Sequence, residues 1–256
     1  MSWLDWLFTP VCPLCQRPTA NGGGCFCRDC VTQLQPAREG LWLTSEVDVA
    51  GMPPLPVMGW GAYRNTVRRS LHSLKYERHP EIGETLGRWM GQRWKATYPQ
   101  IASRLSLHLG TAVSGCSEAK HQTRSRLSPP IAARSAFLVV PIPLHSTRRQ
   151  ERGFNQAEVI ARAFCGVTGN RLRLRLLRRQ RATQPQFGLS TCERSTNVQQ
   201  AFVADTCERQ QWPILLVDDI YTTGATIAAA RHALESKGWK VAAALAVAMA
   251  AMERSP

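Results

Sequence analysis

Short apolar runs alternate along the chain with longer amphipathic stretches. Three of these runs are continuous and lie at 137–140, 214–217 and 241–250. Continuous apolar runs of this length are typical of strands that are buried on both faces, as in a parallel sheet. A fourth strand is predicted over Val57–Tyr63 and leads into a turn. The pattern therefore predicts one sheet built from short, buried strands.

Between the predicted strands, apolar residues recur at helical spacing. Val67, Leu71 and Leu74 fall at i, i+4 and i+7, and a second helix is predicted over Glu81–Lys95. Asn155 is a good N-cap for a third helix. Strands alternating with helices predict the α/β class with a mostly parallel sheet, in which ligands bind at the carboxyl ends of the strands.

Three stretches lack such periodicity. Residues 36–56 are irregular and Pro-rich, which predicts a linker, and residues 97–135 are expected to form a flexible insertion. Residues 182–198 are polar and turn-rich, which suggests a flexible loop over a ligand site. We therefore expect a small module with its linker at 1–56 and a larger domain at 57–256.

Leucine and arginine alternate in the segment from Arg171 to Arg181. This alternation predicts a strand with a charged outer face. Two interpretations stay open for that face. It either protects an edge strand from pairing with another chain or forms a stripe that contacts nucleic acid.

The chain is strongly basic, with a net charge of +14 and a pI near 10.0. This charge favours a polyanionic partner, a strongly anionic substrate, or both. The alternative is a basic, soluble surface that binds no such ligand, because it would have the same net charge. No apolar run reaches the roughly 20 residues that a membrane span needs. The first residues lack the basic region of a secretory signal, so we expect a cytoplasmic protein.

Nine cysteines are present, and five of them precede residue 31. Cys12 with Cys15 and Cys27 with Cys30 form two CxxC pairs, which is the ligand spacing of a structural zinc site. Four thiolates would complete a tetrahedron and leave no position for a substrate. Cys25 is a competing ligand because it stands beside the second pair, and a cluster of free thiols is the plainer alternative.

The run at 214–217 is followed by two carboxylates, Asp218 and Asp219, and then by Thr222-Thr223-Gly224-Ala225-Thr226 at the start of a helix. Backbone N–H groups at a helix start bind phosphate, and threonine hydroxyls add donors. Two acids would repel a bare phosphate, so the ligand must also offer hydroxyl donors or a bound cation. A ribose 5-phosphate meets this demand.

Other proteins place acids after an apolar strand. A Walker B strand needs a GxxxxGK[ST] loop, which this sequence lacks. A phosphatase of the haloacid dehalogenase type needs an acid two residues after Asp218, where this chain has Ile220. An ordinary strand–helix turn with a threonine cap is the remaining alternative.

Arg148, Arg149 and Arg152 are expected to lie in a loop between the strand at 137–140 and the helix capped by Asn155. Guanidinium groups match the oxygens of a pyrophosphate, so this loop is a candidate pyrophosphate site. A solvated basic loop is the alternative. Both this loop and the Asp218 motif follow predicted strands, so they are expected to share one crevice.

The segment from Pro213 to Thr226 resembles the phosphoribosyl pyrophosphate (PRPP) motif of the type I phosphoribosyltransferases, and the whole chain resembles the ComF family of competence proteins, with its GntX-like members. The matching features are the two CxxC pairs, Gly61-Ala-Tyr, Leu74-Lys-Tyr, Val140-Pro-Ile-Pro-Leu-His, Arg152-Gly-Phe-Asn-Gln, Gln184-Pro-Gln, Leu189-Ser, Glu193-Arg194, Asn197-Val, Ala201-Phe and VDDIYTTGAT. Residues 97–135 and 171–175 have no counterpart.

The resemblance implies a sheet of the type I phosphoribosyltransferase kind behind a small N-terminal zinc module. It also implies a role in DNA uptake and natural transformation. By this resemblance Asp218 and Asp219 contact the ribose hydroxyls and are the candidate catalytic residues. Residues 222–226 would cradle the 5-phosphate, and the three arginines would bind the pyrophosphate.

Two functions follow as hypotheses. The first is a phosphoribosyltransferase that binds PRPP with Mg²⁺ and transfers the sugar to an acceptor that the sequence does not reveal. The second is a non-catalytic component of the competence machinery, which senses a nucleotide or binds single-stranded DNA through its basic surface. Competence proteins are expected partners in both cases.

Overall fold

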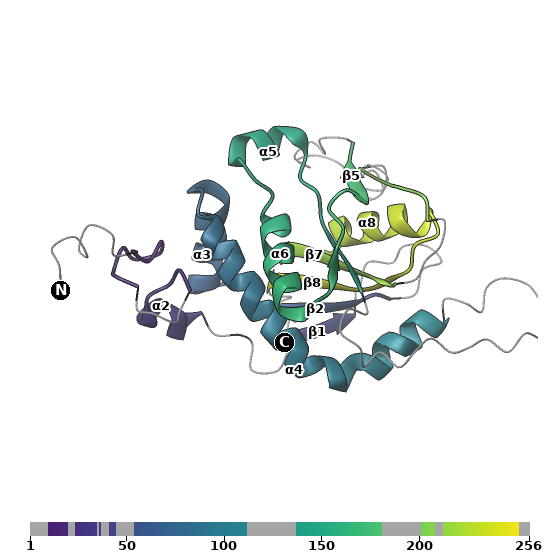
Figure 1. Ribbon diagram of the computed structural model, residues 1–256, viewed down its shortest axis with the longest axis horizontal. Helices are drawn as coiled ribbons and strands as arrows, with labels where there is room; N and C mark the ends of the chain where they lie inside the picture. The colour runs from purple at the N-terminus through teal and green to yellow at the C-terminus, as the bar shows by residue number, and fades with distance from the viewer. Residues whose placement is uncertain are drawn as a thin grey trace, which may run out of the picture.

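A six-stranded sheet has the Asp218 strand near its centre (Figure 1). The structure is a computed structural model that describes residues 10–19, 24–34, 36, 41–44, 54–111, 137–180, 201–207 and 212–250. The strands of this sheet are β1 (Leu41–Thr44), β2 (Pro56–Ala62), β3 (Leu138–Pro141), β4 (Arg171–Leu172), β7 (Ile214–Tyr221) and β8 (Val241–Met249).

The strand order is β1-β2-β8-β7-β3-β4. β1 pairs antiparallel with β2, whereas all other neighbours in the sheet pair in parallel. The predicted α/β class and mostly parallel sheet are confirmed. β1 belongs to the segment expected to be a linker, and the proposed domain boundary at 56/57 falls inside β2, the strand with which β1 pairs.

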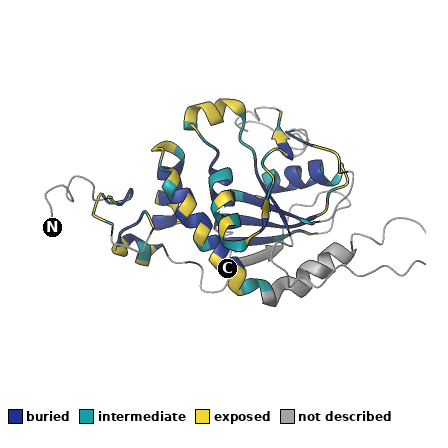
Figure 2. Cartoon of the chain, viewed as in Figure 1, coloured by how far each residue is buried: buried dark blue, intermediate teal, exposed yellow. Residues whose placement is uncertain are grey.

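Helices cover both faces of the sheet. The helices of the described residues are α2 (Arg28–Gln33), α3 (Asn65–Tyr76), α4 (Pro80–Thr111), α5 (Ser146–Arg152), α6 (Gln156–Thr168) and α8 (Ala225–Glu235). α3, α4 and α6 pack on one face. α8 packs on the other, together with a two-stranded antiparallel sheet of β5 (Leu177–Arg179) and β6 (Phe202–Ala204). Figure 2 shows that the central strands are mostly buried, whereas α5 is mostly exposed and buries none of its residues.

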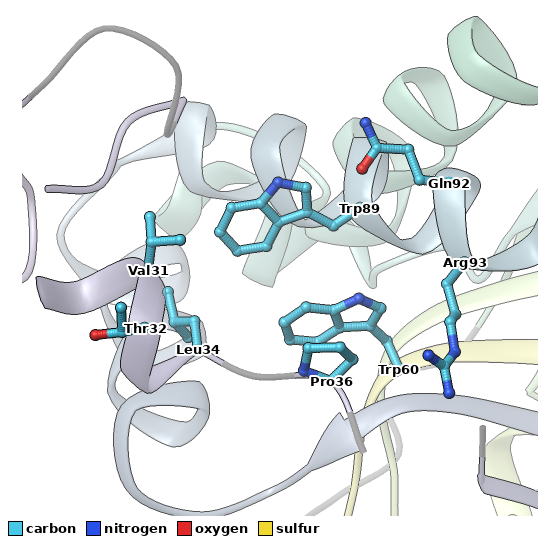
Figure 3. A pocket seen from close by; sticks show the side chains of 8 residues that line it. All are labelled: Val31, Thr32, Leu34, Pro36, Trp60, Trp89, Gln92 and Arg93. Atoms are coloured by element: carbon cyan, nitrogen blue, oxygen red, sulfur yellow. The ribbon is translucent and has the colours of Figure 1, made fainter. Parts of the chain in front are cut away.

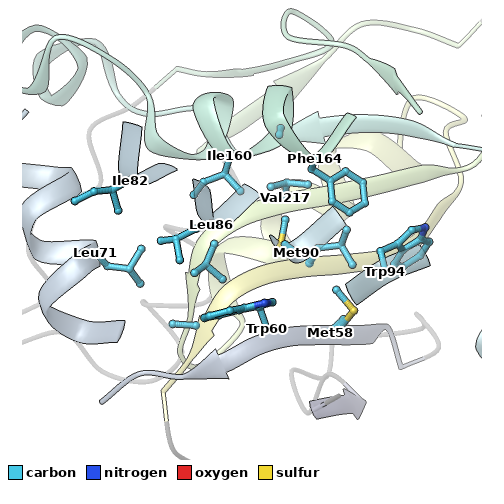
Figure 4. Packing of buried hydrophobic residues seen from close by; sticks show 14 of the residues in the cluster. Met58, Trp60, Leu71, Ile82, Leu86, Met90, Trp94, Ile160, Phe164 and Val217 are labelled. Atoms are coloured by element: carbon cyan, nitrogen blue, oxygen red, sulfur yellow. The ribbon is translucent and has the colours of Figure 1, made fainter. Parts of the chain in front are cut away.

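The apolar run of β7 divides its side chains between two cores. Leu215 and Val217 join the cluster beneath α4 and α6, and Ile214 and Leu216 join the cluster beneath α8. Other members of the first cluster, which Figure 4 shows, are Leu71, Ile82, Leu86, Met90, Trp94, Ile160 and Phe164. Each fully buried side chain of this size contributes about 1.5–3 kcal/mol, so the sheet is held firmly from both sides.

α4 extends further than the sequence pattern indicated. It continues to Thr111 instead of ending near Lys95, so the first part of the expected insertion at 97–135 is helical. The Ser-, Ala- and Arg-rich composition suggested disorder, but Ala, Arg and Leu are also good helix formers. Residues 112–135 and the expected loop at 182–198 lie outside the described residues.

The alternating segment from Arg171 to Arg181 is divided between two sheets. β4 lies at the edge of the large sheet, and β5 pairs with β6. The single predicted strand is therefore wrong, because Leu176 and Leu177 are both buried and interrupt the alternation.

The cysteine-rich module docks onto α3 and α4. Arg69 on α3 donates a hydrogen bond to the carbonyl oxygen of Leu14 at 2.7 Å, and Thr66 donates one to Gln33 at 3.0 Å. Phe26 is fully buried and belongs to the same core as α4. The module therefore shares the apolar core of the larger domain. No described helix combines the length and the apolar character that crossing a membrane requires.

Candidate functional site

The two carboxylates lie at the carboxyl end of the central strand. β7 continues through Asp218 and Asp219 to Tyr221, so the strand ends four residues later than the apolar run alone suggested. Gly224 follows in the left-handed conformation, with φ 82°, and α8 begins at Ala225. Thr222 and Thr223 are exposed in this turn. A side chain at position 224 would be strained, which explains the glycine.

Lys75, at the end of α3, forms an ion pair with Asp219. Its Nζ lies 2.6 Å from Asp219 Oδ2, and the two side chains are only 16% and 13% exposed. The backbone N–H of Asp219 donates a hydrogen bond to Asp218 Oδ1 at 2.8 Å. The pair therefore has a cation on one side and a backbone donor between its members.

Asp218 is the less solvated member of the pair. Although the residue as a whole is only partly buried, desolvation of its carboxyl group raises the pKa well above the ordinary value, and the charge of Asp219 raises it further. The Asp219 N–H and Lys75 lower the pKa but do not cancel these effects. A hydroxyl donor, as on a sugar, would offset the desolvation of this group.

The three arginines lie on a helix and not in the predicted loop. α5 begins after His145, whose Nδ1 accepts a hydrogen bond from the backbone N–H of Thr147 at 3.4 Å, and it ends at Gly153 in the left-handed conformation. These two caps explain why a short polar segment is helical.

α5 and the end of α3 enclose a pocket of about 330 Å³. It is lined by Lys75, Tyr76, Arg78, Arg148, Glu151 and Arg152. The guanidinium carbon of Arg152 lies 5.3 Å from the centre of the Tyr76 ring. Arg149 does not line the pocket and pairs with Glu158 at 3.5 Å. Two of the three predicted arginines are thus brought together with Lys75, which joins the pocket to the acidic pair.

Arg179 on β5 interacts electrostatically with both Arg148 and Asp218. Burial lowers its pKa, the charge of Arg148 lowers it further, and Asp218 raises it. The Arg179 guanidinium carbon also lies 5.3 Å from the centre of the Phe202 ring. The small β5–β6 sheet therefore contributes a cation to the surroundings of the acidic pair.

The four cysteines of the two CxxC pairs converge on one point. The sulfur atoms of Cys12, Cys15, Cys27 and Cys30 all lie within 4.8 Å of one another. Cys15 Sγ lies 3.4 Å from Cys27 Sγ and 3.6 Å from Cys30 Sγ. Zinc–sulfur bonds of about 2.3 Å in a tetrahedron place neighbouring sulfurs about 3.8 Å apart, so this set fits a structural Zn²⁺.

Cys25 is not part of this cluster. Its sulfur accepts a hydrogen bond from Thr85 Oγ1 at 3.5 Å, and burial raises the pKa of its thiol to about 11. By contrast, the pKa of Cys27 is lowered to about 7, chiefly by the backbone N–H of Cys30. The alternative in which Cys25 replaces Cys27 is therefore wrong for this structure, because the cluster of converging sulfur atoms includes Cys27 and not Cys25.

A second, apolar groove lies where the cysteine module meets the larger domain (Figure 3). Its volume is about 350 Å³, and it is lined by Val31, Thr32, Leu34, Pro36, Trp60, Trp89, Gln92 and Arg93. The rings of Trp60 and Trp89 stack with their centres 5.7 Å apart. Its apolar lining suits contact between the two parts of the chain better than binding of a phosphate.

Comparison with known proteins gives two relatives that match most of the chain. The competence protein ComFC of Bacillus subtilis is 26% identical over 229 residues, which cover 89% of this chain and 72% of the relative. The DNA utilization protein YhgH of Salmonella typhi is 26% identical over 232 residues, with 85% and 87% coverage. These two relatives support the resemblance of the chain to the ComF family. Competence protein F of Haemophilus influenzae matches this chain at 30% identity over 92 residues, or 35% of the chain and 40% of the relative. No family model matches.

Sequence patterns missed two residues at this site. Lys75 belongs to the Leu74-Lys-Tyr feature, but its partner lies 144 positions later in the chain, and no local pattern indicates such a contact. Arg179 lies in the segment for which the alternation of leucine and arginine predicts one strand with a charged outer face. The resemblance at residue 75 was the one available signal, whereas nothing in the sequence distinguished Arg179 from its neighbouring arginines.

The variant Asp218→Asn is expected to raise the thermal midpoint of this protein at neutral pH. The folded state holds the Asp218 proton more tightly than the unfolded chain, so the free energy of unfolding falls as pH rises from 3.8 towards the raised pKa. An amide does not ionise, so the variant avoids this loss. Each kcal/mol recovered raises the midpoint by about 2–4 °C.

Thermal unfolding of both proteins across a pH series tests this expectation. The difference should shrink as the pH is lowered through 3.8, where the carboxyl group is protonated in both states. Asp205→Asn is the matched control, because this exposed carboxylate pairs with Arg178 on the surface. A constant difference at every pH would contradict the assigned desolvation.

Proposed function

We propose that this protein binds PRPP, or a nucleotide that carries a ribose 5-phosphate, at the carboxyl end of β7. The observation that supports this most strongly is the placement of the acidic pair between two kinds of anion site. On one side lies the Thr222–Thr226 turn at the start of α8. On the other lies the pocket with Arg148 and Arg152. A sugar with a phosphate at each end matches this order of groups.

In this proposal Asp218 and Asp219 accept hydrogen bonds from the ribose hydroxyls, and residues 222–226 bind the 5-phosphate. Arg148 and Arg152 contact the pyrophosphate, and Arg149 adds to the positive field. Mg²⁺ that arrives with PRPP would neutralise part of the diphosphate charge. Loss of pyrophosphate builds positive charge on the sugar, and the cations around the pocket would stabilise the leaving group.

The names of the relatives refer to competence and to DNA utilization, so we infer a role in DNA uptake and natural transformation, in the cytoplasm and with competence proteins as partners. A second candidate is a non-catalytic component that senses a nucleotide or binds single-stranded DNA. The net charge of +14 favours it, because the charge exceeds what one pyrophosphate requires.

Calorimetric titration with PRPP and Mg²⁺ tests the proposal. We expect saturable binding, whereas ribose, which lacks both phosphates, should not bind. Incubation with candidate acceptors should then be followed by an assay for released pyrophosphate. Release that depends on an acceptor supports the transferase, and binding without any release supports the non-catalytic component. A protein that does not bind PRPP would contradict the transferase, and a protein that binds neither PRPP nor a ribose 5-phosphate nucleotide would contradict the proposed ligand site altogether.

A further inference from the structure

Helix α3 connects the cysteine module to the acidic pair. Figure 1 shows α3 between α2 of the module and the sheet, and the last turn of α3 carries Lys75, which pairs with Asp219 at 2.6 Å. α3 is continuous over 12 residues, which gives it a length of about 18 Å. Because an α-helix is stiff over this length, a displacement at the module end of α3 also moves its last turn.

Each CxxC pair is bonded to α3 separately. Leu14 lies inside the first pair, and its carbonyl oxygen accepts the hydrogen bond from the Arg69 guanidinium group at 2.7 Å. Gln33 lies three positions after Cys30 of the second pair, and its side chain accepts the hydrogen bond from the buried Thr66 hydroxyl at 3.0 Å. The two halves of the cysteine cluster are therefore fixed to the same helix.

The module and α3 also share an apolar core. Three of the four clustered cysteines belong to the same buried cluster as the apolar face of α3, which consists of Val67, Leu71 and Leu74. The free energy of binding a structural metal is part of the folding free energy of such a module. The conformation of the metal-binding turns therefore determines the surface on which α3 packs.

Lys75 depends on the placement of its helix. Its side chain is only 16% exposed, so the position of its ammonium group follows that of the α3 backbone. Desolvation and the charge of Asp219 raise the pKa of Asp218, and Lys75 opposes this shift. A displaced Lys75 would leave two carboxylates with less compensating charge, and a protonated carboxyl group is a weaker acceptor for sugar hydroxyls.

We propose that Arg69 and Thr66 are positioning residues, which hold α3 on the metal-binding module and thereby set Lys75 against Asp219. The cysteine module then controls the affinity of the acidic pair for its sugar ligand and does more than stabilise the fold. This inference rests on the proposed function and adds a role for the module in it.

Calorimetric titrations of the full chain use PRPP with Mg²⁺, or adenosine 5′-monophosphate if that nucleotide binds more tightly. Arg69→Ala is expected to weaken binding about tenfold, which is within the range of coupling between connected residues. Thr66→Val removes the hydroxyl group at nearly constant volume and should have a similar effect. Arg69→Lys keeps a charged donor and should recover part of the affinity. Arg68→Ala, the control, removes an equal charge from the adjacent exposed position.

A double-variant cycle distinguishes positioning from general stabilisation. If Arg69 acts through Lys75, Arg69→Ala should cause no further loss of affinity in a Lys75→Met background. Lys75→Gln replaces Lys75→Met if the latter does not fold. The zinc content of every variant is measured, and Thr66→Val keeps the test valid if Arg69→Ala releases the metal.

Wild-type protein that binds neither PRPP nor the nucleotide would remove the proposed function and this inference with it. Wild-type protein that binds a ligand, combined with Arg69→Ala and Thr66→Val variants that bind it equally well, would remove the inference alone. An equal loss of affinity from Arg69→Ala with and without Lys75 would also overturn it, because Arg69 would then act on the site by another route.

Discussion

The double variant Asp218→Asn/Asp219→Asn is expected to lose measurable affinity for PRPP. Hydrogen bonds to charged groups contribute about 1.5–3 kcal/mol each, so removing both charges should cost on the order of 10²- to 10⁴-fold in affinity. The loss of affinity should be larger than for two exposed carboxylates, because both carboxyl groups are largely desolvated at the end of β7. Isothermal titration calorimetry with PRPP and Mg²⁺ measures it directly.

The control for this variant is Asp205→Asn, which removes an exposed carboxylate that pairs with Arg178 at 2.7 Å. It should bind PRPP like the wild type. The double variant should also keep a cooperative thermal transition, which separates loss of binding from loss of folding. An unchanged affinity in the folded double variant would refute the role of the acidic pair.

Removal of the metal is expected to produce the largest loss of stability. Structural zinc sites bind with about 10–16 kcal/mol, and this binding energy is part of the folding energy of the module. The effect should extend beyond the module because Cys12, Phe26 and Leu34 belong to the same buried cluster as Leu86 and Met90. A strong chelator, or the variant Cys27→Ser, should therefore lower the thermal midpoint of the whole chain.

Metal analysis and thermal unfolding provide the two measurements. Purified protein should contain one zinc ion per chain, and the chelator should release it as the midpoint falls. Cys207→Ser is the matched control, because Cys207 lies outside the cluster of four thiols. A metal-free protein with an unchanged midpoint would show that hydrogen bonds and packing alone maintain the module.

The sequence predicted the acidic pair and the turn that follows it better than it predicted the placement of the cationic side chains around them. The apolar run before Asp218 and the glycine at 224 are local signals, and each has a direct physical reason in strand burial or in backbone conformation. The CxxC spacing likewise predicted the four-cysteine cluster, because two short turns bring each pair of sulfurs together. Local chemistry of this kind can be predicted without a fold.

The contacts between distant segments could not be predicted in this way. The helix that carries Arg148 depends on two end caps, and its sequence resembles that of a polar loop. Lys75 pairs with Asp219 only because the folded chain brings the end of α3 close to the carboxyl end of β7. These features follow from the way the chain packs and not from any short pattern.

The antiparallel pairing of β1 with β2 also limits how the chain can be shortened. β1 occupies the outer edge of β2, whose own residues are mostly buried and apolar. A fragment that starts at Val57 would leave the amide and carbonyl groups of that edge open to other molecules, which is a common cause of aggregation. Fragments designed to isolate the sheet should therefore begin before Leu41.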